Sequence, residues 1–175
     1  MPSSICKWRT NVEEPTDTAI LAPSAMNLHP WAFPALLNRE RISNYAKRIK
    51  DCRFANFDQT SFDPSIRTMR KPIEGENYSV FHNTPALVLV LATSPLVQAS
   101  DDCCLAAQNL MLAARDEGLG TCCIGLARHW LNLPSTKREM GLPAASEVVV
   151  PIVLGHPKAW PDSHGRNPAQ IYWLG

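Results

Sequence analysis

The sequence predicts a three-layer domain of the α/β or α+β class, with helices packed on a central sheet. Two strand-length runs rich in Val and Leu, at residues 85–92 and 146–157, are typical of strands that are buried on both faces. Segments with apolar residues at helical spacing separate these runs, so helices and strands alternate along the chain. A length of 175 residues and a hydrophobic content of 45% suit one domain with a sizeable core.

The first predicted helix covers residues 38–50, where Ile42 and Ile49 recur on one face. Before it, Pro34 interrupts an apolar run, so the strand expected there is short or lies at an edge of the sheet. After it, residues 51–78 lose the helical period and mix Phe with Asp, Pro and Gly. We expect this segment to be an irregular excursion that contacts a partner or a substrate.

The strongest helix pattern follows at residues 100–120. Ser100 or Asp101 is the expected N-cap, and two glycines at the far end stop the helix. Because its side chains are apolar nearly all round, we expect this helix to lie at the centre of the domain.

The remaining predicted elements are short. Residues 121–127 form a strand-like run that ends at Gly125. A helix is expected to begin near Pro134 and to end at Gly141, because proline suits a first helical turn and glycine suits the residue after the last one. A further strand-like segment is expected at residues 171–174.

Charge and hydropathy argue against several classes of protein. A net charge of +1 gives no sign of a nucleic-acid or anionic-membrane partner. No run reaches the roughly 18 apolar residues of a membrane span. Lys7 and Arg9 are not followed by the apolar region of a signal peptide, so the expected location is the cytoplasm.

The cysteines are expected to be reduced, buried packing residues. Adjacent cysteines are poor disulfide partners, and the two doublets lie in apolar, small-residue segments. The doublets also lack spacings such as C-x2-C that a zinc site favours. Thiol chemistry and a structural metal-binding role stay open as alternatives. The cysteines are Cys6, Cys52, Cys103, Cys104, Cys122 and Cys123.

Motifs of several common enzyme classes are not found: the sequence has no G-x-G-x-x-G, Walker A, H-E-x-x-H or G-x-S-x-G. Its five histidines do not pair at metal-ligand spacing on a helix. The stretch APSAMNLHPW at residues 22–31 is unusual, because Asn27 and His29 stand between prolines in an apolar run. Polar groups placed in this way are more typical of a ligand site than of a core strand.

Four blocks, in order along residues 20–174, resemble the nitroreductase family of FMN-dependent oxidoreductases. APSAMNLHPW resembles the family turn A-P-S-x-x-N-x-Q-P-W, and DCCLAAQNLMLAARDEGLGTCCIG resembles its central helix and the strand after it. VVVPIVLGHPK and RNPAQIYWL resemble its late strand and its C-terminal segment. The resemblance implies a three-layer α+β fold with a mixed or antiparallel sheet flanked by helices, and a homodimer with FMN at its interface.

The resemblance also implies a set of cofactor-binding residues. The small-residue turn would touch the isoalloxazine ring, Asn27 would bind the polar rim of the ring, and Arg166 would bind the phosphate. Two alternatives stay open: Asn27 as a turn residue that caps local backbone, and Arg166 as an exposed tail residue. The implied residues are Pro23, Ser24, Ala25, Asn27, His29, Cys123, Ile124, Gly125, Arg166 and Arg9.

The N-terminus departs from the family pattern. The family has R-R-S-x-R and then a second helix before the turn, whereas KWRTNVEEPTDTAIL alone stands before Ala22. Arg9 and Thr10 are a reduced trace of the phosphate-binding motif, and the segment is expected to be too short for the second helix. His29 stands where the family has Gln.

The resemblance implies an FMN-dependent enzyme that passes hydride from NAD(P)H to a nitroaromatic, a quinone or a similar small acceptor. The flavin carries the chemistry, so no catalytic acid or base and no metal are expected. The shortened N-terminus favours an alternative, a flavin-binding or storage protein or a degenerate family member with little turnover. We expect one domain over residues 1–175 and neither a nucleic-acid nor a membrane partner.

Overall fold

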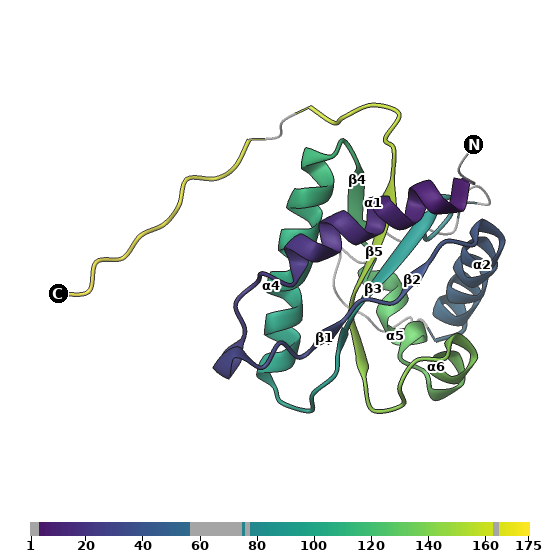
Figure 1. Cartoon of the computed structure of the whole chain (residues 1–175), viewed down its shortest axis with the longest axis horizontal. Coiled ribbons are helices and arrows are strands. Elements are labelled where there is room, and N and C mark those ends of the chain that lie inside the picture. The colour runs from purple at the N-terminus through teal and green to yellow at the C-terminus, as the bar shows by residue number, and fades with distance from the viewer. Residues whose placement is uncertain (1–3, 57–74, 76–77, 163–164) are drawn as a thin grey trace.

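The structure, a computed structural model, describes residues 4–56, 75, 78–162 and 165–175 (Figure 1). The helices are α1 (Ser4–Ala19), α2 (Arg39–Asn56), α4 (Gln98–Asp116), α5 (Arg128–Leu131) and α6 (Pro134–Met140), with 3-10 turns η1 (Ala25–Asn27) and η2 (Gly125–Ala127). The strands are β1 (Trp31–Ala32), β2 (Ala35–Leu36), β3 (Ala86–Ala92), β4 (Gly120–Cys123) and β5 (Glu147–Gly155). None of the described helices is long and apolar enough to cross a membrane.

The five strands form one sheet in the order β1-β3-β5-β4, and β2 also pairs with β3. Every pair is antiparallel. The register between β3 and β5 shifts at Val90 and Leu91, where a bulge breaks the ladder. β4 pairs only with β5 and is therefore the outer strand of the described sheet.

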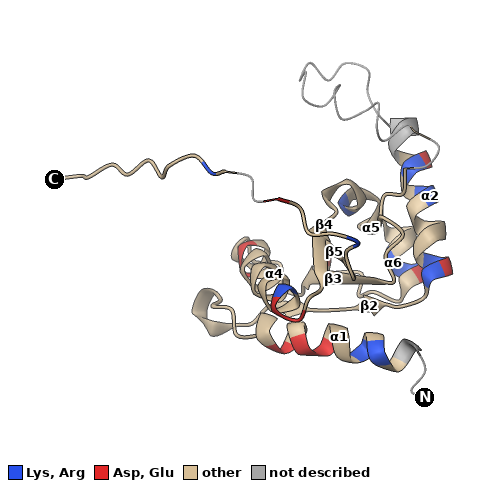
Figure 2. Cartoon of the chain, turned by 90° about the horizontal axis from the view of Figure 1, so that it is seen from above, with Lys and Arg blue, Asp and Glu red and all other residues tan. Residues whose placement is uncertain are grey.

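Helices cover both faces of the sheet, as the three-layer prediction requires. α1 and α4 lie on one face, and α2, α5 and α6 lie on the other (Figures 1 and 2). All seven residues of β3 are buried. Val88 and Val90 pack in the core with α1 and α4, whereas Leu87, Leu89 and Leu91 pack in the core with α2 and α5. This double burial explains the continuous Val and Leu run in the sequence.

The strand around Pro34 is short, as predicted. β1 and β2 are two-residue strands on either side of this proline, and both pair with β3. The Pro34 carbonyl accepts a hydrogen bond from the Leu89 N–H at 2.9 Å, but proline has no N–H to return to the ladder.

The segment before Ala22 was expected to be too short for the family's second helix, but a helix occupies it. α1 is a 16-residue helix that contains Pro15. An interior proline removes one helical hydrogen bond and normally ends or kinks a helix. Here Val12 and Ala19 lie in the core against α4, so tertiary packing outweighs the local cost of the proline. Arg9 and Thr10 consequently belong to a helix rather than to a loop.

α4 differs from its prediction in two ways. It begins at Gln98, with Val97 as an N-cap that makes no side-chain hydrogen bond, so neither Ser100 nor Asp101 caps it. It is also covered on one side only, since Leu105 is 46% exposed and Leu112 is 60% exposed in the single chain.

The tail after β5 contains no helix or strand in its described residues, so the strand predicted at 171–174 is wrong. Residues 165–175 are exposed, and Figure 1 shows them extending away from the domain. A strand needs a partner for its backbone groups, and the tail meets none within this chain.

Of the six cysteines, only Cys103 is buried. Cys52 is half-buried and the other four are exposed, so the prediction of burial is wrong for those four. Cys122 and Cys123 lie on the outer strand β4, and Cys104 lies on the uncovered side of α4. The exposed cysteines are Cys6, Cys104, Cys122 and Cys123.

Candidate functional site

The turn that follows α1 has an unusual backbone. Met26, Asn27 and His29 have φ angles of 52°, 56° and 49°, in the left-handed region that non-glycine residues seldom occupy. Such conformations persist where the surrounding structure imposes them, and they are concentrated at ligand and active sites. All three side chains are exposed.

Contacts from distant parts of the chain fix this turn. The N–H of Ala25 donates to both carboxylate oxygens of Asp102 on α4, at 3.1 and 3.2 Å. The Pro30 carbonyl accepts the Thr93 N–H at 3.0 Å, which ties the end of the turn to the end of β3. The turn is therefore held at both ends.

Local contacts hold the polar side chains of the turn. The N–H of His29 donates to Ser24 Oγ at 3.0 Å, and Asn27 Oδ1 lies 2.8 Å from His29 Nε2. The His29 ring stacks on Trp31, with ring centroids 5.4 Å apart. The Asn27 oxygen is thus engaged locally, in line with the alternative of a capping role, while its side-chain NH2 has no hydrogen-bond partner in the described part of the chain.

The end of β4 presents a second candidate surface. The N–H of Ile124 donates to the Pro151 carbonyl at 2.8 Å, and the Ile124 side chain is buried. Gly125 is exposed, and a Cβ atom added to it would meet nothing within 4 Å. The space above this glycine is open, so a ligand can approach the backbone closely there.

The surroundings of Cys123 disfavour the thiolate form of its side chain. Its Sγ lies 3.4 Å from Met111 Sδ on α4. Burial is the main cause that raises the pKa of the Cys123 thiol, and the nearby thiols of Cys122 and Cys104 raise it further. A thiolate is the nucleophilic form, so a raised pKa disfavours thiol chemistry at neutral pH.

The structure does not bring all the predicted residues together in one chain. The turn at residues 23–29 is attached to the start of α4 through Asp102, and β4 is attached to the middle of α4 through Met111. Among the described residues, no hydrogen bond or ring contact joins the turn to residues 123–125.

Arg9 lies far from the turn. It is ten residues before the end of α1, which corresponds to about 15 Å along the helix axis. It lines a cavity of 480 Å³ together with Glu13 and Asp17, and Figure 2 shows the acidic residues beside the basic end of α1. The two carboxylates make this cavity a poor place for a phosphate.

Arg166 lies in the extended tail, where its guanidinium donates to the Gly165 carbonyl at 3.4 Å. Figure 1 shows the tail pointing away from the domain, so Arg166 does not reach the turn or Gly125 of its own chain. His164, another possible phosphate ligand in the tail, falls outside the described residues. Most of the predicted contact segment at residues 51–78 also falls outside them.

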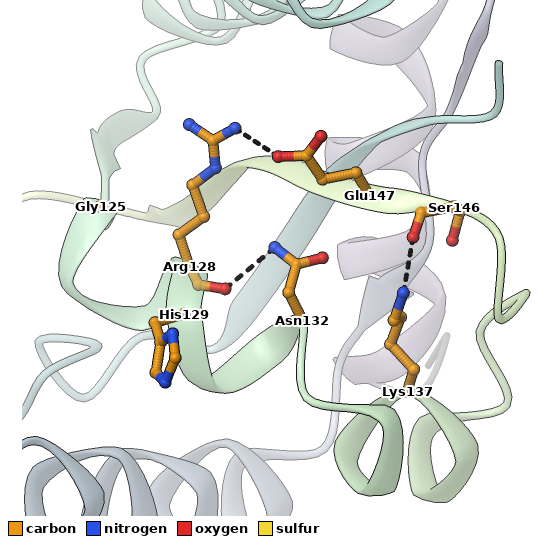
Figure 3. Close-up of a pocket in the computed structure, with 7 residues that line it drawn as sticks. All are labelled: Gly125, Arg128, His129, Asn132, Lys137, Ser146 and Glu147. Carbon is orange, nitrogen blue, oxygen red and sulfur yellow. Dashed lines mark hydrogen bonds and ion pairs between the residues drawn. The ribbon is translucent and has the colours of Figure 1, made fainter. Parts of the chain in front are cut away.

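A cavity of 610 Å³, which no sequence motif predicted, opens beside Gly125 (Figure 3). Arg128 pairs there with Glu147 at 2.6 Å. Asn132 accepts the Val148 N–H at 2.8 Å and donates to the Val148 carbonyl at 2.9 Å, which holds α5 against β5. Arg128 and Asn132 follow Gly125 closely in the sequence, but their partners Glu147 and Val148 lie 19 and 16 residues further along the chain.

The fold matches that of solved flavoproteins. A nitroreductase with bound FMN from Bacteroides fragilis superposes with a TM-score of 0.78 at 23% identity, over 100% of this chain and 89% of that one. A nitroreductase with bound FMN from Desulfitobacterium hafniense gives a TM-score of 0.76 at 21% identity, over the same shares of the two chains. At these identities the likeness establishes the fold class, a three-layer α+β domain of the nitroreductase type.

Sequence comparison identifies the family. The profile of the Nitroreductase family matches residues 9–156. A protein of Archaeoglobus fulgidus, named as a candidate NADH dehydrogenase/NAD(P)H nitroreductase, is 25% identical over 171 residues, which cover 93% of this chain and 83% of the relative. The chain belongs to the nitroreductase family.

Proposed function

We propose that the protein is an FMN-dependent oxidoreductase that uses NAD(P)H to reduce a small acceptor such as a nitroaromatic compound or a quinone. Membership of the nitroreductase family supports the reaction class, and the names of its relatives support FMN and the nicotinamide donor. The observation that carries the proposal is the strained, exposed turn at residues 23–29 that Asp102 holds in place.

The turn suits the rim of a flavin. Pro23, Ser24 and Ala25 present small groups that leave room for a flat ring, and Asn27 and His29 present exposed polar atoms beside it. Because the backbone already occupies its left-handed conformation, binding requires no further ordering of the turn.

The end of β4 suits the reactive edge of the flavin. We propose that Cys123, Ile124 and Gly125 approach the ring through their backbone, with the open space at Gly125 as the point of closest contact. Bound FMN would supply the chemistry, accepting a hydride from NAD(P)H with a proton from solvent and returning two electrons and two protons to the acceptor. The chain's own residues would bind and orient the ring.

The separation of these two surfaces supports a homodimer as part of the proposal. The turn and Gly125 do not meet within one chain, so we propose that the turn of one protomer and Gly125 of its partner form one site. The uncovered face of α4, with Leu105 and Leu112, offers an apolar interface. Arg166, on the extended tail, would reach the partner's cofactor.

A second candidate function is flavin binding with little turnover. It is favoured by the position of Arg9, which lies in a cavity with two carboxylates and away from Gly125. A weakly held phosphate would lower the affinity for FMN.

The absorbance spectrum of the purified protein, with and without added FMN, tests the proposal. We expect flavin bands that bleach under anaerobic conditions when NADH or NADPH is added, and that return when a quinone is added. Bands that persist in the presence of both donors would indicate the second function. If no protein-bound flavin absorbance appears after FMN is added, both functions are refuted.

The substitution Gly125→Ala tests the proposed contact directly. The new methyl group meets no protein atom within 4 Å, and φ is not positive at this residue, so we expect an unchanged urea unfolding midpoint. We expect FMN affinity to fall about tenfold or more, because the methyl group occupies the space proposed for the ring edge. An unchanged FMN affinity in the folded variant would place the flavin elsewhere.

A further inference from the structure

A cavity of 770 Å³ lies at the start of β4, at the opposite end of that strand from Gly125. Four basic side chains line it, and no described residue that lines it is an Asp or a Glu. The basic residues are Arg39, His82, His156 and Lys158. A cavity with cations and ring N–H donors but without carboxylates favours an anion.

The two permanent cations of this cavity are available to a ligand. Among the described residues, neither Arg39 nor Lys158 has a hydrogen-bond or ion-pair partner for its side chain. The cations beside Gly125 differ in this respect. Arg128 is paired with Glu147, and Lys137 Nζ donates to the carbonyls of Ala144 and Ser146 at 2.8 Å.

The wall of the cavity has a strained backbone. His82 and Asn83 have φ angles of 50° and 54°. The other non-glycine residues with positive φ in the described part of the chain are the three in the turn at 23–29. Left-handed non-glycine residues are concentrated at ligand sites, and this wall shares that feature with the proposed flavin turn.

Aromatic contacts hold the segment that carries Lys158. The Arg115 guanidinium on α4 lies 3.2 Å from the ring centroid of Trp160, and the rings of Trp8 and His156 are 5.5 Å apart. Residues 156–160 are thus fixed at both ends, so the Lys158 ammonium is presented from an ordered segment rather than from a free tail.

β4 connects this cavity to Gly125. Thr121 and Cys122 line the cavity, and Gly125 follows three residues after Cys122. Three residues of extended chain span about 10 Å, so the two sites are separated by a distance that an extended ribityl chain and its phosphate can bridge. A ligand with its ring at Gly125 can extend along the outer strand and place an anion between Arg39 and Lys158.

We propose that this cavity binds a phosphate ester, with Arg39 and Lys158 as the charged ligands. The inference rests on the proposed function for the identity of the ester. FMN is the source that the continuity with Gly125 favours. The pyrophosphate of the nicotinamide dinucleotide carries the same chemistry and is the other source.

Comparing the affinities for FMN and riboflavin distinguishes the contribution of the phosphate to binding from that of the ring. The two ligands share the isoalloxazine, so we expect Arg39→Gln and Lys158→Gln each to weaken FMN binding about tenfold and to leave riboflavin binding unchanged, measured by flavin fluorescence quenching in the full-length protein. Lys47→Gln, an exposed cation on the same helix as Arg39, is the matched control. Arg9→Gln should also leave FMN affinity unchanged.

The other outcomes are decisive as well. If the two substitutions spare FMN but raise the Kd for NADH, measured by its fluorescence, the cavity serves the dinucleotide. If FMN, riboflavin and NADH affinities are all unchanged in the double variant, the proposal is overturned. If the wild-type protein binds neither flavin, the proposed function fails, and a titration with inorganic pyrophosphate then tests the phosphate site by itself. Pyrophosphate binding that the double variant loses supports the site. No pyrophosphate binding by the wild-type protein overturns it.

Discussion

The backbone N–H of Ala25 points at the carboxylate of Asp102, seventy-seven residues later, and donates to both of its oxygens at 3.1 and 3.2 Å. Asp102 is buried, at 5% exposure, and it lies in the helix that also packs against α1 and β4. One carboxylate therefore fixes the position of the proposed flavin turn relative to the main helix of the domain.

Replacing Asp102 with Ala should destabilise both the fold and the turn. The variant leaves the partly buried N–H of Ala25 without this partner, and hydrogen bonds to a charged group contribute about 1.5–3 kcal/mol. We expect the free energy of unfolding in urea to fall by about that amount and the FMN affinity to fall with it. Asp101→Ala, an exposed neighbour on the same helix, should change neither quantity by more than about 0.5 kcal/mol. Equal effects of the two substitutions would contradict a positioning role for Asp102.

The pair of Arg48 and Glu139 should give the fold a pH dependence in the acid range. The guanidinium donates two parallel hydrogen bonds, at 2.8 and 2.9 Å, and it lies 4.9 Å from the centroid of the Trp130 ring. The hydrogen bond from Arg48 lowers the pKa of Glu139 below its ordinary value. A lowered folded-state pKa stabilises the fold above the unfolded-state pKa of about 4.3, and this stabilisation is lost as the pH falls through the folded-state value.

Urea unfolding at several pH values measures this contribution. Both side chains are about two-fifths exposed, so solvent screening limits the pair to about 1 kcal/mol or less at neutral pH. Glu139→Gln should lower the stability by that amount at pH 7 and should have almost no effect near pH 3. Lys47→Gln, beside Arg48 on α2, is the control. A Glu139→Gln effect that persists at pH 3 would show that packing, and not charge, stabilises the contact.

The sequence predicted those features that depend on neighbouring residues. Pro34 splits one short strand in two, and Gly141 ends α6 with a φ of 72°. The Val and Leu runs became β3 and β5, because a strand covered on both faces must be apolar at every position. The family resemblance likewise depended on local motifs.

Long-range pairing was not visible in the sequence. No sequence motif links Asp102 to Ala25, yet its carboxylate accepts the Ala25 N–H on another element. Pro15 lies inside α1, and packing of Val12 and Ala19 against α4 keeps the helix continuous. The cavity of Arg39 and Lys158 joins residues more than a hundred positions apart, and no spacing rule connects them.

The thiols of Cys103 and Cys104 should differ strongly in reactivity, although they are adjacent. Burial is the main cause that raises the pKa of Cys103 to about 12, whereas Cys104 is exposed. The thiolate fraction of Cys103 at pH 8 is then about 10⁻⁴, so we expect its alkylation by iodoacetamide to be slower than that of an ordinary exposed thiol by about a thousandfold. Peptide mass spectrometry after timed quenching measures both sites. In urea above the unfolding midpoint the two rates should converge, and fast native labelling of Cys103 would contradict its burial.

Removing the tail after Pro161 should weaken the proposed homodimer and leave the domain folded. The last apolar residues are exposed in the single chain, Trp173 at 90% and Leu174 at 95%, and the described tail contributes no helix or strand. We expect the circular dichroism spectrum per folded residue to be retained, because the described residues of the tail belong to no helix or strand. The dissociation constant of the dimer, from sedimentation equilibrium, should rise at least about tenfold, because burial of one large apolar side chain alone contributes about 1.5–3 kcal/mol. Deletion of Gly175 alone is the control. A truncated protein that remains dimeric with unchanged affinity would show that the tail does not dock on the partner, and it would leave the uncovered face of α4 as the interface to test.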